Sequence, residues 1–190
     1  MEKNDAADRP GHSHRGKFTE GLLDNDLILQ ALDIQVGQVI LDAGCGNGYM
    51  SKLFSEKVTA SGRVIALDPD KHFLAVLARE TKGTNIITVA GDITRPTNLQ
   101  PSSIDLIYIS TVIHGFSKNE LQGFFRESKR LLKPDSIVAI VEIEKKETPF
   151  GPPLSSRYSP EELKEIVPMV PVQTLSVGDH FYMQLFRTED

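Results

Sequence analysis

The stretch VILDAGCGNGYM, residues 39–50, ends an apolar run with an aspartate and follows it with three glycines separated by single residues. Each glycine gives up side-chain packing and adds backbone entropy that folding must remove. Such a loop is expected where bare backbone has to lie close to a ligand. The carboxylate of Asp42 beside it favours a ligand that carries positive charge.

Further residues that could contact a ligand follow other apolar runs along the chain. They are, in order, Asp68, Pro69 and Asp70, then Asp92 and Ile93, then Ser110, Thr111 and His114, and finally Glu142 and Glu144. If these runs are parallel strands, their carboxyl ends meet at one edge of a sheet, which is where such sheets bind ligands. Carboxylates crowded at one edge repel each other, so a cationic ligand is their natural partner.

The elements that must position these residues alternate between two patterns. Short apolar runs predict strands, and apolar residues at helical spacing predict helices. The predicted strands are residues 38–42, 62–68, 85–92, 103–110 and 136–144, and the predicted helices are residues 19–32, 49–58, 71–80 and 119–132, the last closed by KPDS. This alternation predicts right-handed crossovers and a parallel sheet covered on both faces.

The C-terminal part departs from the alternation. Residues 145–158 are rich in Pro, Gly and Ser and predict a long loop, and Ser159, Pro160 and Glu162 then form a helix-start pattern. Two strand patterns flanking Gly-Asp predict an antiparallel hairpin. The expected fold class is therefore α/β: Rossmann-like and doubly wound, with a mostly parallel seven-stranded sheet and an antiparallel C-terminal hairpin strand. We expect residues 1–17 to form a flexible arm and residues 18–190 a single domain.

Composition narrows the classes of function. The net charge of -5 gives no general attraction to nucleic acid or anionic lipid. The single cysteine, Cys45, excludes an internal disulfide and a thiolate metal cluster, and no metal site is expected. No apolar run approaches the ~20 residues of a membrane span, and the N-terminal segment lacks the apolar core of a signal peptide. These features favour a cytoplasmic location.

The glycine spacing separates classes of nucleotide ligand. A dinucleotide fingerprint, G-x-G-x-x-G, needs its third glycine at position 49, where this chain has Tyr49. A Walker loop is also missing, because the sequence contains neither Gly-Lys-Ser nor Gly-Lys-Thr. A nicotinamide-dependent dehydrogenase is therefore disfavoured.

Together the motifs resemble the class I S-adenosylmethionine-dependent methyltransferases. The segments that carry the resemblance are VILDAGCGNG, VIALDPD, AGDIT, IDLIYISTVIHGF and LLKPDSIVAIVE. The resemblance runs from about Leu22 to the C-terminus. The later segment GPPLSSRYSPEEL looks like the small-molecule branch, which includes quinone-type and arsenite methyltransferases.

The resemblance implies S-adenosylmethionine as the cofactor. It implies that the glycine loop passes the methionine part, that Asp42 lies near the ammonium group, and that Asp68 accepts hydrogen bonds from the ribose hydroxyls. The adenine would meet Asp92 and the Ile93 N–H, and the Ser110 carbonyl would face the ammonium. The full implied set is Asp42, Gly44, Cys45, Gly46, Asn47, Gly48, Asp68, Pro69, Asp92, Ile93, Ser110 and Thr111.

His114 has two interpretations: it could take a proton from the methyl acceptor, or it could pack over the cofactor. Arg157 and Tyr158 could contact the acceptor, or belong to a surface loop.

A small-molecule acceptor is favoured, with its nucleophilic atom open between N, O, S and C. The sequence reads ISTV where base-methylating members carry an Asn- or Asp-Pro-Pro-aromatic motif, and it lacks the further cysteines that arsenite transfer uses. The alternatives are a non-catalytic S-adenosylmethionine-binding protein, or a methyltransferase acting on a protein or RNA. The sequence leaves the oligomeric state open.

Overall fold

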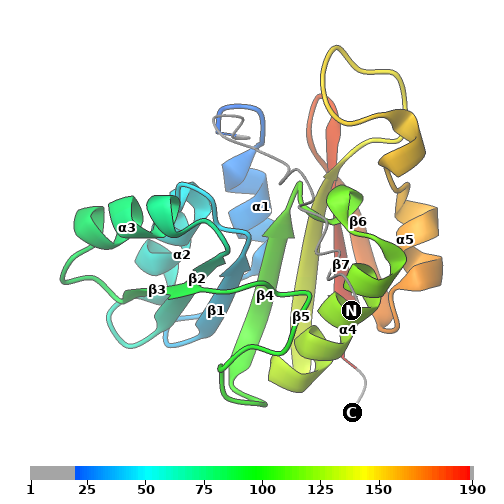
Figure 1. The fold of residues 1–190 in the computed structure, drawn as a ribbon. Helices are drawn as coiled ribbons and strands as arrows, with labels where there is room; N and C mark the ends of the chain where they lie inside the picture. Colours follow the sequence, from blue (N-terminus) through cyan, green and yellow to red (C-terminus); the bar gives the residue numbers. More distant parts are fainter. Residues whose placement is uncertain (1–19, 189–190) are drawn as a thin grey trace, which may run out of the picture.

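A computed structural model describes residues 20–188 of the chain, so the expected arm of residues 1–17 lies outside the described residues. Figure 1 shows one sheet with helices packed on both of its faces. The strands are β1 (Val39–Ala43), β2 (Arg63–Asp68), β3 (Ile86–Ala90), β4 (Ile104–Ser110), β5 (Leu132–Ile143), β6 (Val170–Gly178) and β7 (Phe181–Arg187).

The strand order confirms the expected fold class. The seven-stranded sheet runs β3-β2-β1-β4-β5-β7-β6. Strand β1 pairs in parallel with β2 on one side and with β4 on the other, so the chain reverses its direction of winding between them. Strand β7 runs antiparallel to both β5 and β6. The reversal between β1 and β4 is the point where doubly wound sheets open a crevice for ligands.

Alternating side chains on the strands divide the core between the two faces. The helices are α1 (Asn25–Leu32), α2 (Tyr49–Val58), α3 (Lys71–Glu80), α4 (Lys118–Leu131) and α5 (Pro160–Ile166), with short 3-10 turns η1 (Ile113–Gly115) and η2 (Leu154–Ser156). Ile40 of β1 packs with residues of α1 and α2, whereas its neighbour Leu41 packs with residues of α4 and α5. Both faces of β1 are therefore buried, as expected for a central parallel strand.

Several element boundaries differ from the sequence prediction. Helix α1 begins at Asn25 instead of residue 19, because the Asp24 carboxylate accepts the Leu27 N–H and caps the helix there. The KPDS segment is not a turn outside the sheet: β5 starts at Leu132 and includes it, with a register shift in its pairing to β4. Helix α5 begins as expected, with a capping box formed by Ser159 and Glu162.

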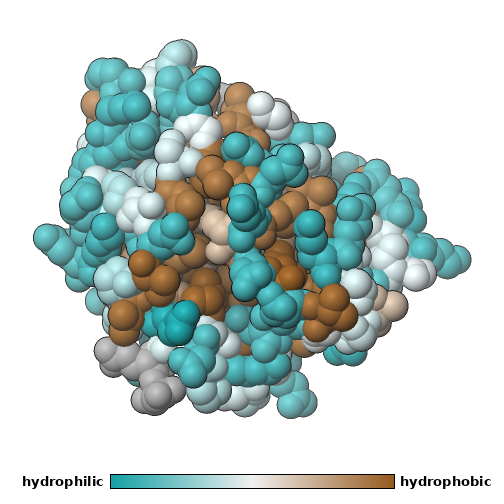
Figure 2. All heavy atoms as spheres, turned by 180° about the vertical axis from the view of Figure 1, so that it is seen from behind, coloured by the Kyte–Doolittle hydropathy of each residue, from teal (hydrophilic) through white to brown (hydrophobic). Residues whose placement is uncertain are grey.

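The surface carries apolar as well as hydrophilic side chains. Seen from behind, apolar side chains lie in patches separated by hydrophilic ones (Figure 2). Edge strand β6 carries two exposed apolar side chains, Val170 and Val172. No helix within residues 20–188 has the length and apolar character needed to cross a membrane.

Candidate active site

The glycine loop folds back onto the end of the neighbouring strand. The N–H groups of Gly44 and Cys45 both donate to the Leu67 carbonyl of β2, at 2.8 and 3.1 Å. Gly44 and Gly48 have positive φ angles of 73° and 74°. A Cβ at Gly44 would lie 2.8 Å from the Val112 side chain, and one at Gly48 would lie 2.4 Å from Leu77. Both conformation and close packing therefore require glycine at these two positions.

Asp68, the last residue of β2, is bound to this loop. Its Oδ2 accepts the Gly46 N–H at 2.9 Å and its Oδ1 accepts the Asp70 N–H at 2.8 Å. The side chain is buried. Backbone amides therefore fix the orientation of a carboxylate at the carboxyl edge of the sheet, and each oxygen keeps a further lone pair for a hydroxyl donor.

Asp42 lies on β1 and is buried with a single side-chain hydrogen-bond partner within residues 20–188. That partner is the Ser51 hydroxyl of α2, which donates to Oδ2. Burial and, to a smaller extent, repulsion from Asp68 raise the pKa of the Asp42 carboxyl to about 7, against the lowering effect of the Ser51 hydrogen bond. A nearby cation would favour its ionised form.

The residues after β3 form a turn that is stabilised by hydrogen bonds to the Asp92 side chain. Asp92 Oδ1 accepts hydrogen bonds from the Thr94 N–H at 2.9 Å and from its hydroxyl at 2.7 Å. Ile93 is buried. Helix α4 packs directly on this turn, since a Cβ at Gly123 would lie 1.9 Å from the Thr94 carbonyl oxygen. The position of Asp92 is thus coupled to the packing of α4.

Beyond β4 the backbone turns sharply. Thr111 has a φ of 55°, which a residue with a branched side chain seldom adopts. Its N–H donates to the Val141 carbonyl of β5 and its hydroxyl donates to the Ser110 carbonyl, both at 2.8 Å. Strain of this kind is concentrated at functional sites, and it aims the following residues, 112–114, along the sheet edge.

His114 forms a pair with Glu142 that the sequence did not indicate. His114 Nδ1 lies 2.8 Å from Glu142 Oε2, and the His114 backbone N–H lies 3.3 Å from Oε1. Glu142 is fully buried on β5, whereas the His114 side chain is 12% exposed. The sequence placed both residues at the same sheet edge, but their contact depends on the 3-10 turn η1, which has no clear sequence signature.

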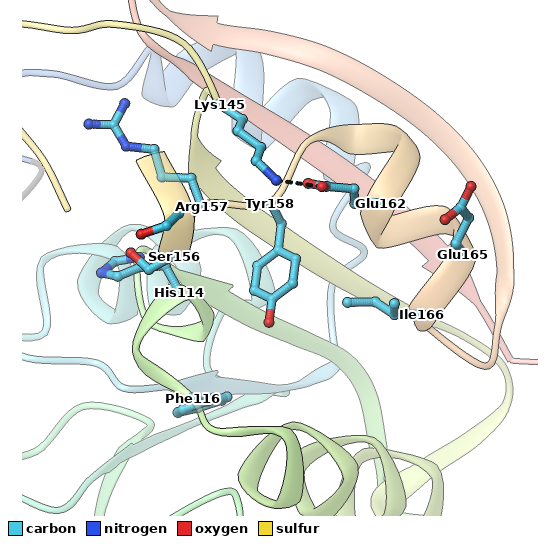
Figure 3. Close-up of a pocket in the computed structure, with 10 residues that line it drawn as sticks. His114, Phe116, Lys145, Ser156, Arg157, Tyr158, Glu162, Glu165 and Ile166 are labelled. Carbon is cyan, nitrogen blue, oxygen red and sulfur yellow. Dashed lines mark hydrogen bonds and ion pairs between the residues drawn. The ribbon is translucent and has the colours of Figure 1, made fainter. Parts of the chain in front are cut away.

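A pocket of about 420 Å³ opens beside His114. Figure 3 shows the Tyr158 ring extending into the space between His114, Phe116 and Ile166. Other lining residues come from the end of β5, the η2 loop and α5: Lys145, Ser155, Ser156, Arg157, Glu162 and Glu165. The Lys145 ammonium forms an ion pair with Glu162.

Arg157 is buried and holds the loop together. Its guanidinium donates to the backbone carbonyls of Pro152, Glu144, Lys146 and Phe150, and to the Thr148 hydroxyl. In Figure 3 its guanidinium points away from the pocket. The Tyr158 backbone is held in turn by the Tyr182 hydroxyl, which donates to its carbonyl at 2.7 Å. Of the two loop residues singled out in the sequence, Tyr158 therefore offers its side chain to the pocket and Arg157 shapes the loop.

The remaining candidate residues have simpler surroundings. Cys45 is buried, and burial raises the pKa of its thiol, which keeps it unreactive. Asn47 lies on the loop, where its side chain accepts the Tyr49 N–H at 3.1 Å. Residues 20–188 contain no group of three His, Cys, Asp or Glu side chains arranged for a metal ion.

Comparison with known proteins shows which family this chain resembles. The model of a family described as "Methyltransferase domain" matches residues 40–135, half of the chain, from β1 into β5. The chain is similar to a crystal structure of a SAM-dependent methyltransferase from Aquifex aeolicus, with 23% identity, 89% of this chain and 92% of that chain covered, and a TM-score of 0.79.

Two further relatives match over shorter lengths. A protein-L-isoaspartate O-methyltransferase of Aeropyrum pernix is 49% identical over 53 residues, which is 28% of this chain and 20% of that protein. An uncharacterized methyltransferase of Synechocystis is 26% identical over 132 residues, which is 69% of this chain and 59% of that protein. The matches thus span less than two thirds of either relative. Because the family model matches half of the chain, the chain belongs to the methyltransferase domain family.

Proposed function

We propose that this chain transfers a methyl group from S-adenosylmethionine to a small-molecule acceptor in the pocket beside His114. The observation that carries the proposal is the Asp68 carboxylate, which the backbone amides of Gly46 and Asp70 hold at the carboxyl edge of the sheet. A fixed carboxylate beside a glycine loop suits a ligand with a neighbouring pair of hydroxyls, such as a ribose.

The surrounding groups fit the rest of the cofactor. The glycine loop presents backbone without side chains to a ligand, because a Cβ at Gly44 or Gly48 would clash with Val112 or Leu77. Asp42 supplies a buried carboxyl for the ammonium group, and the turn at Asp92 and Ile93 supplies acceptor and donor groups for the adenine edge. The proposed binding set is completed by Cys45, Gly46, Asn47, Asp68, Pro69, Ser110 and Thr111.

When bound, S-adenosylmethionine supplies an electrophilic methyl group on a positively charged sulfur. The protein then has three tasks: to bind and orient the acceptor, to exclude water, and to accept a proton if the acceptor carries one. Phe116 and Tyr158 provide apolar surface for the acceptor, and His114 is the proposed proton acceptor. The volume of about 420 Å³ suits a small molecule.

The binding half of the proposal is tested by calorimetry with S-adenosylhomocysteine on the wild-type chain and on Asp68→Ala. Loss of two hydrogen bonds to a charged group, at about 1.5–3 kcal/mol each, is expected to weaken binding by at least roughly 100-fold. The matched control is Asp105→Ala. Asp105 also accepts a backbone N–H, from Val39 at 2.8 Å, but it lies where β4 begins, at the opposite edge of the sheet. Equal affinities of wild type and Asp68→Ala would refute the site.

The catalytic half needs a turnover measurement. The wild-type chain is incubated with S-adenosylmethionine and a small-molecule fraction of a cell extract, and the release of S-adenosylhomocysteine is measured. Release that depends on the fraction supports an enzyme. Binding without any release would favour the alternative, a non-catalytic S-adenosylmethionine-binding protein.

A further inference from the structure

We propose that the acceptor is a neutral molecule methylated on a hydroxyl group, and that Glu142 positions His114 to take the hydroxyl proton. This inference rests on the proposed function. Its basis is the contact of one buried carboxylate with one histidine at the wall of the pocket.

Within residues 20–188 the only ion-pair contact of Glu142 is with His114, and it is an ion pair only when the imidazole is protonated. Both of its oxygens contact His114: Oε2 lies 2.8 Å from Nδ1, and Oε1 lies 3.3 Å from the backbone N–H. Within residues 20–188 it has no Lys or Arg partner, although it is fully buried. A buried acid without a cation costs stability, so its position calls for a function.

The contact decides which ring nitrogen is basic. A carboxylate can only accept hydrogen bonds, so the hydrogen of the neutral imidazole lies on Nδ1 and the lone pair lies on Nε2. Within residues 20–188 no hydrogen bond engages Nε2. His114 lines the pocket, and its side chain is 12% exposed. Glu142 therefore holds the ring in the tautomer that can take a proton through Nε2, and it would stabilise the imidazolium that results.

The pair also lies next to the proposed cofactor loop. Val112, two residues before His114, packs so closely on Gly44 that a Cβ there would lie 2.8 Å from its methyl group. The short turn η1 follows directly. A single short segment therefore connects the glycine loop to the pocket wall, which puts a proton acceptor near the proposed position of the methyl donor.

The charges around the pocket argue against an anionic acceptor. Of the two cationic side chains that line it, Lys145 is paired with Glu162, and the Arg157 guanidinium is bound to backbone carbonyls. The remaining charges nearby are the carboxylates of Glu165 and Glu142. A carboxylate or phosphate acceptor would meet no available cation and would be repelled.

Among neutral nucleophiles, a hydroxyl has the greatest need of a base. An amine attacks through its existing lone pair and loses its proton afterwards, and a thiol, with a pKa near 8.5, already has a few per cent of the strongly nucleophilic thiolate in neutral solution. In the proposed step the hydroxyl proton moves to His114 Nε2 and an oxygen electron pair forms the new O–CH3 bond. The electron pair of the broken S–CH3 bond stays on sulfur, and the imidazolium later releases its proton to solvent.

The first test needs neither cofactor nor acceptor. Heteronuclear NMR of the imidazole nitrogens, with the His114 signal assigned from His114→Gln, reports the tautomer in the wild-type chain, in Glu142→Gln and in Glu144→Gln. Glu144 is the control because its carboxylate pairs with Lys146 near the end of the same strand. We expect the Nδ1–H form in wild type and Glu144→Gln, and its loss in Glu142→Gln. An unchanged tautomer in Glu142→Gln would overturn the positioning role.

The second test uses four ring-matched probes at millimolar concentration: phenol, thiophenol, aniline and benzoate. We expect phenol to have the highest kcat/KM. Glu142→Gln should lower kcat on phenol by about 10- to 100-fold, with little change in KM or in affinity for S-adenosylhomocysteine. Preference for any other probe, or methylation of none of them by a chain that binds S-adenosylhomocysteine, would overturn the inference. Failure to bind S-adenosylhomocysteine would instead refute the proposed function itself.

Discussion

Asp42 is expected to make cofactor binding depend on pH. Burial and repulsion from Asp68 raise the pKa of its carboxyl to about 7, so the group is mostly neutral at pH 6 and mostly ionised at pH 8. The proposed ligand group, an ammonium, is attracted only to the ionised form. Affinity for S-adenosylhomocysteine should therefore increase as the pH rises through 7.

The size of the effect follows from the pKa. If only the ionised form binds, the apparent Kd is multiplied by one plus ten to the power of pKa minus pH, which is about 11 at pH 6 and about 1.1 at pH 8. Affinity should thus fall roughly 10-fold between pH 8 and pH 6. In Asp42→Asn this dependence should vanish, and the affinity at pH 8 should be no better than that of wild type at low pH.

The same raised pKa acts in the opposite direction on folding. The folded state holds the Asp42 proton more tightly than the unfolded chain, where the pKa is near 3.8. The free energy of unfolding therefore loses this contribution as the pH rises from about 4 to 7. At 1.36 kcal/mol for each pKa unit the loss is at most ~4 kcal/mol. Asp42→Asn should be more stable than wild type at pH 8 and no more stable at pH 4.

Two measurements decide the matter: calorimetry with S-adenosylhomocysteine between pH 6 and 8, and urea unfolding at pH 4 and 8. Ser51→Ala is the informative variant, because loss of the Ser51 hydrogen bond should raise the pKa of Asp42 and move the binding transition to higher pH. A wild-type Kd that stays constant from pH 6 to 8, or an Asp42→Asn variant that is not stabilised at pH 8, would refute the reasoning.

Two substitutions outside the strand ends should have separable effects. Gly123→Ala places a Cβ 1.9 Å from the Thr94 carbonyl oxygen, so we expect a loss of about 1–3 kcal/mol in thermal unfolding and weaker S-adenosylhomocysteine binding, because the turn after β3 must move; unchanged melting would contradict this. Burial would raise the pKa of Glu127, but hydrogen bonds from Arg130 and Thr97 lower it to about 2. Glu127→Gln should therefore lower stability by about 2 kcal/mol at pH 7, a difference that disappears as the pH falls from about 4 through 2, with ligand affinity unchanged.

Much of the fold could be predicted because its signals are local. Apolar runs such as VIALD mark the buried strands, and their order of alternation with helices fixes the right-handed parallel arrangement. The start of α5 was predictable from Ser159 because a capping box lies within four residues. The start of α1 was missed because apolar spacing continues upstream of Asp24, whose cap ends the helix. The KPDS segment was read as a turn because its register shift depends on pairing with β4.

The candidate site also has parts that could be predicted from the sequence and parts that could not. The glycine loop and Asp68 have a fixed spacing in sequence, so their association at one edge could be inferred, and the Gly46–Asp68 hydrogen bond now joins them. The His114–Glu142 contact spans 28 residues and two elements, and it depends on the strained backbone at Thr111. The part that Arg157 plays in holding the loop could not be predicted for a related reason, because most of its partners are backbone carbonyls, which carry no signal in sequence.

The distribution of buried acids ties the two proposed subsites together. Residues 20–188 bury four carboxylates: Asp42, Asp68, Glu127 and Glu142. Glu127 is paired with Arg130. The other three lie near the ends of β1, β2 and β5, with no Lys or Arg partner within the described residues. Buried charges are normally paired, and groups that violate this rule are concentrated at functional sites. Because all three lie toward the carboxyl edge of one sheet, a cationic ligand bound there would supply positive charge that no Lys or Arg of the described residues provides.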